Sequence, residues 1–286
     1  MSKTYKGQIT NSVVELTLQD EAVGGFDTPT IVWDDTVNGE IDQVQGDIPD
    51  DWKTGGGIKQ LQIGSSCTSI GSGAFQYCSN LSQELIIPDS VTSIGSRAFY
   101  QGVVGGTMPF TGSLVIPDSV TSIGSSAFSA GFGYTNWSGT LTLGNSLTSI
   151  GASAFFSAKG FTGDLIIPDS VTTIEGAAFY DCKTFNGTLT IGNSVTTIGI
   201  DAFSFCTLTG DLVIPDSVTT IGSKAFYFCA SITRVEILAI TAPTIGSNAF
   251  KLMSSVSPAE IHVPVGATGY AATYGTNPVL TVVADL

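Results

Sequence analysis

A block of the form Ile-Pro-Asp-Ser-Val-Thr-Ser-Ile-Gly-Ser-x-Ala-Phe recurs along this chain of 286 residues. Its closing Ala-Phe pair occurs eight times, at intervals of 24, 29, 27, 24, 24, 23 and 24 residues. The phenylalanines are Phe75, Phe99, Phe128, Phe155, Phe179, Phe203, Phe226 and Phe250. A fixed period in this range is the signature of a solenoid, in which one short unit stacks on its neighbours. The repeat therefore predicts one elongated body that presents surface.

The unit that spans residues 164–182 shows what each repeat position is expected to do. Leu165 and Ile167 alternate with an outward neighbour, which is typical of a β-strand. Residues 168–170, Pro-Asp-Ser, are a turn sequence, because proline presets φ and Asp or Ser bonds the local backbone. The unit then returns to the core and ends in the Ala-Phe pair. One such coil cannot bury enough apolar surface to be stable alone, whereas stacked coils can.

The unit resembles the BspA-type leucine-rich repeat, whose pattern is Ile-Pro-x-x-Val-x-x-Ile-Gly-x-x-Ala-Phe-x-x-Cys. The resemblance covers residues from about 58 to 252. It departs from the pattern where Gly-Asn replaces Pro-Asp, at 144–145 and 192–193, and where Ile174-Glu175 replaces Ile-Gly. The resemblance implies a mainly β, right-handed leucine-rich-repeat solenoid of about eight coils with short parallel strands. A non-repeat N-terminal β segment and a C-terminal cap would close its ends.

Three segments follow from this resemblance. Residues 1–57 are an acidic N-terminal cap or attachment segment, residues 58–252 are the repeats, and residues 253–286 are a C-terminal capping segment. A cap is needed because the last coil would otherwise expose its apolar edge. Two roles stay open for residues 1–57: a β-type cap over the first coil, or an arm that attaches the chain to a larger assembly.

The balance of charge restricts the partners. The chain holds 24 Asp and Glu against 10 Lys and Arg, a net charge of −14. That excess argues against nucleic acid as a partner and disfavours anionic membranes. The sequence has no apolar run long enough for a transmembrane helix, and its first residues lack the apolar region of a secretory signal. We expect an extracellular protein, on a cell surface or on the exterior of a virion.

Four of the five cysteines, Cys78, Cys182, Cys206 and Cys229, lie three residues after a repeat phenylalanine. The last three fall in consecutive coils, where a zinc site or a disulfide is conceivable. However, the total is odd, and no Cys-x-x-Cys or histidine accompanies them. We interpret these cysteines as small buried hydrophobic residues.

Aspartates recur in the turns, at Asp89, Asp118, Asp169 and Asp216. A row of calcium ligands is one interpretation, since Ca²⁺ takes several oxygen ligands. Asn145 and Asn193 interrupt the row, and no Asp-x-Asp loop occurs, so turn capping is the preferred interpretation.

Catalysis finds little support. His262 is the single histidine, and the many serines belong to the repeat, without a Gly-x-Ser-x-Gly motif. No phosphate-binding glycine loop occurs. We predict that the chain is not an enzyme and has no catalytic residue, no cofactor and no metal.

Two long units carry insertions that depart from the core pattern, at 102–109 and 131–134. Insertions in solenoids gather on one edge and often bind partners. The candidate partner-binding residues here are Phe132, Tyr134, Trp137 and Met108. Trp137 also holds a leucine-type position of the repeat, which favours core filling for that residue. The alternative for Phe132 and Tyr134 is a small cluster packed over the coil edge.

The resemblance to the BspA-type family implies a non-catalytic surface protein that adheres to host or partner macromolecules. The first hypothesis is therefore a recognition or adhesion module that binds a protein or a glycan through the solenoid face or the inserted edge. The alternative is a structural, decoration or receptor-binding component of a phage particle or another large assembly, anchored by its N-terminal segment.

Overall fold

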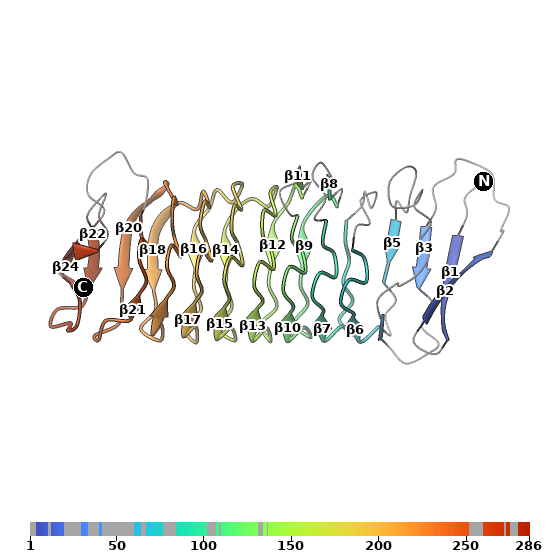
Figure 1. The fold of residues 1–286 in the computed structure, drawn as a ribbon, viewed down its shortest axis with the longest axis horizontal. Helices are drawn as coiled ribbons and strands as arrows, with labels where there is room; N and C mark the ends of the chain where they lie inside the picture. The colour runs from blue at the N-terminus through green and yellow to red at the C-terminus, as the bar shows by residue number, and fades with distance from the viewer. Residues whose placement is uncertain are drawn as a thin grey trace.

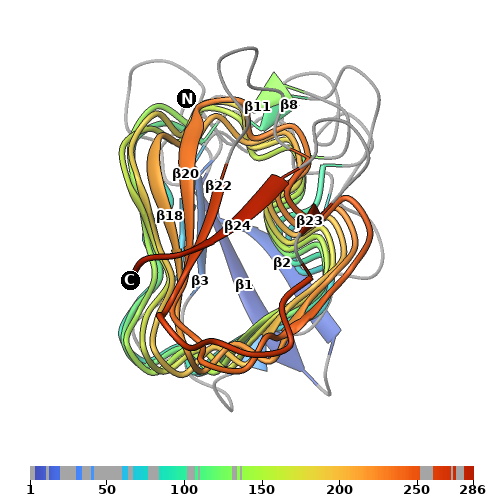
Figure 2. The ribbon, with the colours of Figure 1, turned by 90° about the vertical axis from the view of Figure 1, so that its left-hand side faces the viewer.

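The chain folds into a parallel β-solenoid, as predicted, with about seven turns where about eight coils were expected. The computed structural model describes residues 4–10, 13–19, 30–33, 40–41, 60–63, 67–76, 84–101, 107–108, 110–130, 134–135, 137–251, 260–271, 273–274 and 280–286, and no helix occurs among them. The body is elongated, with its two ends at the two chain termini (Figure 1). Seen end-on, successive coils superimpose (Figure 2). None of the described residues belongs to a helix that could cross a membrane.

One ladder of nine short parallel strands runs along the body. In spatial order its strands are β4 (Glu40–Ile41), β6 (Ser69–Ile70), β7 (Ser93–Ile94), β10 (Ser122–Ile123), β13 (Ser149–Ile150), β15 (Thr173–Ile174), β17 (Thr197–Ile198), β19 (Thr220–Ile221) and β21 (Thr244–Ile245). The register is kept from coil to coil, so that Ser93, for example, pairs with Ser122 and Ile94 with Ile123. Each repeat position therefore forms a row along the solenoid axis.

Strands of the Leu-x-Ile type form shorter sheets elsewhere on the coil. They are β9 (Leu114–Val115) with β12 (Leu141–Thr142), β14 (Leu165–Ile166) with β16 (Leu189–Thr190), and a five-stranded sheet ordered β18 (Gly210–Ile214), β20 (Ile232–Ile237), β22 (Glu260–Val263), β24 (Leu280–Ala284), β23 (Thr273–Tyr274). The last three strands end the body. In this end, Ile261 and Val263 are buried, and the Tyr270 hydroxyl donates to the Ala239 carbonyl at 2.7 Å.

The N-terminal strands continue the solenoid rather than leaving it. They form a sheet ordered β2 (Val13–Gln19), β1 (Thr4–Thr10), β3 (Thr30–Trp33), β5 (Gln60–Gln62). β3 pairs in parallel with β5, and β4 pairs in parallel with β6. The parallel stacking thus extends N-terminal of residue 58, and β2 closes the sheet by pairing antiparallel with β1.

The core is built around a column of stacked rings. The eight repeat phenylalanines are at most 3% exposed. Neighbouring rings lie 5.2 to 5.6 Å apart, and most are parallel to within 10°. A second column is formed by Phe110, Trp137, Phe161 and Phe185, with centroids 4.9 to 6.0 Å apart. Strand spacing of about 4.8 Å explains both columns, because identical side chains on adjacent coils meet at that distance.

Hydroxyl groups join the coils along the outside, which explains why serine and threonine are so frequent in the repeat. In the Pro-Asp-Ser turn, Ser119 Oγ donates to the Val91 carbonyl of the preceding coil at 2.7 Å, and Ser170 Oγ to that of Leu147 at 2.8 Å. A second row of such bonds involves the hydroxyls of Thr92, Thr121, Thr148, Thr172, Thr196 and Thr219. Each hydroxyl supplements the backbone ladder with a bond to the coil before it.

Candidate binding surface

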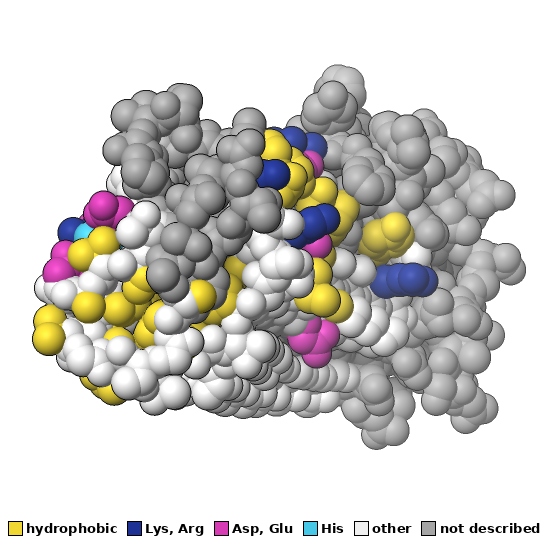
Figure 3. Space-filling model, turned by 60° about the vertical axis from the view of Figure 1, so that its left-hand side comes forward, with side chains coloured by type: hydrophobic (Ala, Val, Ile, Leu, Met, Phe, Trp, Pro, Cys, Tyr) yellow, Lys and Arg dark blue, Asp and Glu magenta, His cyan; other side chains and the backbone are white. Residues whose placement is uncertain are grey.

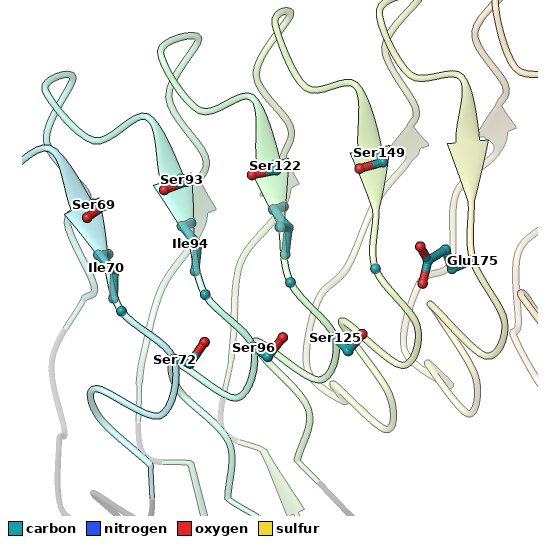
Figure 4. A pocket seen from close by; sticks show the side chains of 15 residues that line it. Ser69, Ile70, Ser72, Ser93, Ile94, Ser96, Ser122, Ser125, Ser149 and Glu175 are labelled. Carbon is teal, nitrogen blue, oxygen red and sulfur yellow. The ribbon is translucent and has the colours of Figure 1, made fainter. Parts of the chain in front are cut away.

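A serine-lined groove crosses four coils beside the long strand ladder. Its volume is about 560 Å³, and Figure 4 shows its two rows of serines. The upper row consists of Ser69, Ser93, Ser122 and Ser149, and the lower row of Ser72, Ser96 and Ser125. Between them the lining is Ile-Gly backbone. We call this feature the serine groove.

The glycines of the groove fit the short distance between the coils that carry them. A Cβ atom on Gly95 would lie 2.5 Å from the backbone nitrogen of Ser72, and one on Gly124 would lie 2.5 Å from that of Ser96. Real Cβ atoms do not approach backbone so closely. The glycine row therefore lets each coil rest directly on the one before, and it keeps the groove free of larger side chains.

Glu175 ends the groove. It occupies the position at which the preceding coils have glycine, and it is the only ionisable side chain that lines the groove. The backbone N–H of Ala152 donates to Glu175 Oε2 at 2.9 Å. At the same repeat position in the groove, none of the hydrogen bonds among the described residues uses the N–H of Ser72, Ser96 or Ser125. The backbone N–H at this repeat position therefore donates to a carboxylate in the coil of Ala152 and has no such acceptor in the coils of Ser72, Ser96 and Ser125.

Chemically, the serine groove offers hydroxyl groups and backbone N–H donors at the spacing of the coils. Such a surface can hydrogen-bond an extended chain that presents acceptor oxygens at regular intervals. Among the described residues, no hydrogen bond joins a serine hydroxyl of the groove to Glu175. The single histidine, His262, lies in β22, where its Nδ1 is 2.8 Å from Asp285 Oδ1.

A second open face is apolar. The middle residues of the Leu-x-Ile strands point outward, and several of them are β-branched hydrophobics. Ile86, Val115, Ile166 and Val213 are 69%, 53%, 57% and 37% exposed. Thr142 and Thr190 stand between them in β12 and β16, so the apolar row is interrupted.

The described parts of the two insertions lie side by side. β8 (Thr107–Met108) pairs in parallel with β11 (Tyr134–Thr135), so that Thr107 faces Tyr134 and Met108 faces Thr135. Phe132 lies outside the described residues, as do the side chains of Met108 and Tyr134. The insertions are thus adjacent at β8 and β11, and their role in partner binding stays a prediction.

Trp137 is a core residue, and its inclusion among partner-binding residues is corrected. It is 2% exposed and stacks between Phe110 and Phe161, at 5.3 and 4.9 Å. Its leucine-type repeat position explains this burial. A side chain so enclosed cannot contact a partner.

The predicted cysteine column is present and buried. The thiols of Cys182, Cys206 and Cys229 donate to the carbonyls of Phe155, Phe179 and Phe203 at 3.0 to 3.1 Å. Burial raises the pKa of all three thiols, in the case of Cys229 to about 12. Such thiols stay protonated and are poor ligands for metal ions. Cys78 lies outside the described residues.

The turn aspartates bond the neighbouring coil. Asp118 Oδ1 accepts the backbone N–H of Asn145 at 2.7 Å, and Asp169 Oδ1 accepts that of Asn193 at 2.7 Å. The asparagines that interrupt the aspartate row are thus the partners of these aspartates. No group of three or more potential metal ligands occurs within the part of the chain that the structure describes.

Sequence reasoning missed the serine groove. Its signal was present: the Gly-to-Glu change at position 175 coincides with a Ser-to-Ala change at position 152 in the coil before. Either change alone is an ordinary departure from the repeat and indicates no site. Only the stacking of coils shows that the two residues meet.

Stacked coils, aromatic columns and hydroxyl ladders define the class of leucine-rich-repeat solenoids. The family model described as the BspA type leucine rich repeat region matches residues 52–186 and 131–257, with six copies. The chain therefore belongs to this family, as the sequence resemblance implied. A search of curated protein sequences finds no match.

Three solved structures are similar to this chain to different degrees. A leucine-rich repeat protein from Bacteroides ovatus is 20% identical, with a TM-score of 0.63 over 92% of this chain and 70% of that one. The pneumococcal vaccine antigen PcpA is 16% identical, with a TM-score of 0.44 over 91% and 74%. A leucine rich cell surface protein from Faecalibacterium prausnitzii is 24% identical, with a TM-score of 0.39 over 79% and 71%. The first of these likenesses supports the fold, and none of them identifies a ligand.

Proposed function

We propose that this chain is a non-catalytic surface recognition module that binds an extended segment of a protein or glycan partner in the serine groove. The observation that carries the proposal is the hydrogen bond from Ala152 N–H to Glu175, at 2.9 Å. In this bond a carboxylate oxygen accepts from the backbone N–H of Ala152. Ser72, Ser96 and Ser125 hold the same repeat position in the other coils of the groove and present the same backbone N–H. A partner with repeated acceptor oxygens would extend this row along the groove.

The chain belongs to a repeat family, and stacked repeats form extended surfaces of the kind that bind partners. This supports a binding role rather than an enzymatic one. The proposal places the protein outside the cell, on a cell surface or on a virion. The pairing of β3 with β5 supports a capping role for residues 1–57 over an attachment arm. The paired insertions that contain Met108, Phe132 and Tyr134 are a proposed second contact at the edge.

The test is a binding screen with matched variants. Wild-type protein is applied to panels of immobilised polysaccharides and cell-surface proteins. The groove variant is Ser96→Gln/Ser125→Gln, in which two larger uncharged side chains fill the lower row. The control is Ser223→Gln/Ser247→Gln, which makes the same change at the same repeat position outside the groove.

We expect a partner that the wild type and the control retain and that the groove variant binds at least about tenfold more weakly, as when contacts worth about 1.4 kcal/mol are lost. Equal binding by the two variants would place recognition elsewhere on the solenoid. Thermal melting of both variants checks that the fold is intact.

A further inference from the structure

Half-buried aromatic side chains form a row that begins on the last two coils lining the serine groove and continues toward the C-terminus. The rings of Phe156 and Tyr180 stack with centroids 4.9 Å apart at 4°. Tyr180 meets Phe205 at 5.4 Å, and Phe205 meets Phe228 at 5.1 Å. Tyr227 closes the row, 4.2 Å from Phe228. Phe156, Tyr180 and Tyr227 come directly after a buried Ala-Phe pair, and Phe205 and Phe228 come one residue later. All five are half-buried and lie outside the core.

Lysines border this row. Lys159, Lys183, Lys224 and Lys251 are all the lysines that the sequence contains after residue 59. Lys183 lies 5.8 Å from the ring centroid of Phe205, while Lys224 and Lys251 lie 5.6 and 5.7 Å from that of Tyr227. In a chain of net charge −14, this concentration of cations is an exception. In the described part of the surface, Figure 3 shows dark-blue, yellow and magenta side chains close together above a white lower face.

Acidic groups offset only part of this charge. Lys159 and Lys183 both contact the Asp181 carboxylate, at 3.0 and 2.6 Å. Burial acts to raise the pKa of Asp181, but the hydrogen bonds from Lys183 and Lys159 lower it on balance. Asp201, which accepts from Ser204 at 2.7 Å, is the other acidic group beside the row. Lys224 and Lys251 have no carboxylate partner among the ion pairs of the described residues.

The backbone accepts strain to hold two of these rings. Phe205 and Phe228 have φ values of 61° and 59°, in the left-handed region that bulky residues avoid. The same position holds Ser157 and Asp181 in the two preceding coils. A left-handed conformation costs about 1–2 kcal/mol per non-glycine residue. Phenylalanine at both places therefore exposes aromatic surface at a cost in stability.

We infer that this lysine–aromatic edge, formed by the five aromatic residues and four lysines above, binds an acidic polypeptide segment. The Phe156 and Tyr180 rings stack face to face, and lysines lie over the rings of Phe205 and Tyr227, so several ring faces in the row already have a neighbour. Ring edges carry positive partial charge and suit carboxylate oxygens, as lysines do. A sugar would instead need an exposed ring face on which to stack. The edge is separate from the serine groove, so its test is independent of the proposed function.

The probes are poly-L-glutamate, a glutamate–tyrosine copolymer, and polygalacturonate as an acidic glycan. Binding to the full chain is measured by fluorescence anisotropy at low and high ionic strength. We expect both polypeptides to bind, the copolymer more tightly, and polygalacturonate to bind more weakly. Lys224→Gln should weaken polypeptide binding by about two- to fivefold, the range expected for one exposed charge contact. Adding Lys251→Gln should weaken it further by a similar factor.

Arg97→Gln is the matched control. Arg97 holds the repeat position of Lys224 and lies 5.7 Å from the ring of Tyr100, but Ser129 separates it from the aromatic row. This variant should keep wild-type affinity. Phe228→Asn, which suits a left-handed backbone, should remove the preference for the copolymer while the melting temperature changes little.

Three outcomes would overturn the inference. Equal losses for Arg97→Gln and Lys224→Gln would indicate diffuse charge attraction. Tighter binding of polygalacturonate, with the same lysine dependence, would identify a glycan site. Failure of all three probes to bind at low ionic strength would exclude an acidic ligand.

Discussion

Single residues in this solenoid are chosen by the coil above and the coil below. The Phe179 ring is stacked at 5.2 Å on one side and 5.4 Å on the other, within 4° of parallel on both. Gly124 is held as closely, because a Cβ would lie 2.5 Å from the backbone of Ser96. Flat rings and bare backbone both fit a spacing set by hydrogen-bonded strands.

Replacing Phe179 tests the ring column. Phe179→Ala should lower the free energy of unfolding by about 3–5 kcal/mol, because a fully buried ring with neighbours on both sides leaves a cavity. Urea denaturation measures the loss. Phe156→Ala, at a half-buried ring, should cost clearly less. A near-neutral Phe179→Ala would contradict the position of the core.

Replacing a groove glycine tests the contact between coils. Gly124→Ala should destabilise the protein by about 1–3 kcal/mol, since the added methyl group meets rigid backbone. The control is Gly176→Ala, whose Cβ has its nearest contact at 3.3 Å, the Ile200 carbonyl oxygen. Calorimetric melting of both variants gives the comparison. Equal effects would mean that the coils can separate to admit a side chain.

At the scale of elements, side-chain ladders supplement strands of only two residues. Two-residue strands contribute few backbone bonds, so the hydroxyls and carboxylates between coils carry part of the cohesion. Asp164 Oδ1 accepts both the backbone N–H of Thr188, at 2.6 Å, and its hydroxyl, at 2.9 Å. These bonds tie the start of one Leu-x-Ile strand to the start of the next.

The Asp164 contact predicts a pH dependence. The backbone and side-chain hydrogen bonds from Thr188 lower the pKa of Asp164. A carboxylate whose pKa is lower in the folded state stabilises the fold above its unfolded pKa of about 3.9 and ceases to do so as pH falls through the folded value. Asp164→Ala should therefore lower the melting temperature at neutral pH, and the difference from wild type should vanish in strong acid.

Asp211 supplies the control for this series, because it holds the same repeat position and accepts no hydrogen bond among the described residues. Asp211→Ala should change the melting temperature little at any pH. A pH-independent difference for Asp164→Ala would rule out an ionic contribution.

At the scale of the whole molecule, coils behave as nearly equivalent layers. β14 and β16 pair Leu165 with Leu189, one full coil apart. In a solenoid, stability is approximately a sum over units and their interfaces. Removal of a complete unit should therefore leave a folded body that is one layer shorter.

Deletion of residues 165–188 tests this layered construction. Because the cut joins equivalent positions, the shortened chain should fold, with a lower melting temperature and a shorter long axis by small-angle scattering. Deletion of residues 165–176 removes half a coil and should abolish the cooperative melt. Loss of folding in the first variant would show that the array depends on that coil in particular.

The sequence predicted those features that repeat and missed those that vary. Identical residues at a fixed interval foretold the phenylalanine column, the thiol column and the strand ladders. The pairing of β3 with β5 was not foreseen, because those segments do not carry the repeat motif. The lysine–aromatic edge was also missed, since its aromatic residues occupy two variable repeat positions and its lysines occupy several others. Whether side chains at these different repeat positions come close together depends on the path of the backbone within each coil, which the sequence pattern does not give.

Near-identical layers carry a hazard during folding, because a coil can stack on the wrong neighbour and still match its apolar pattern. Glu175 makes such a shift costly, since it stands where other coils have a glycine that contacts the preceding backbone. The paired strands β8 and β11 mark a second unique place, because only adjacent long coils can join them. These irregularities distinguish individual coils and so favour one stacking register. A variant in which they were regularised would be expected to populate misregistered arrays and to refold more slowly.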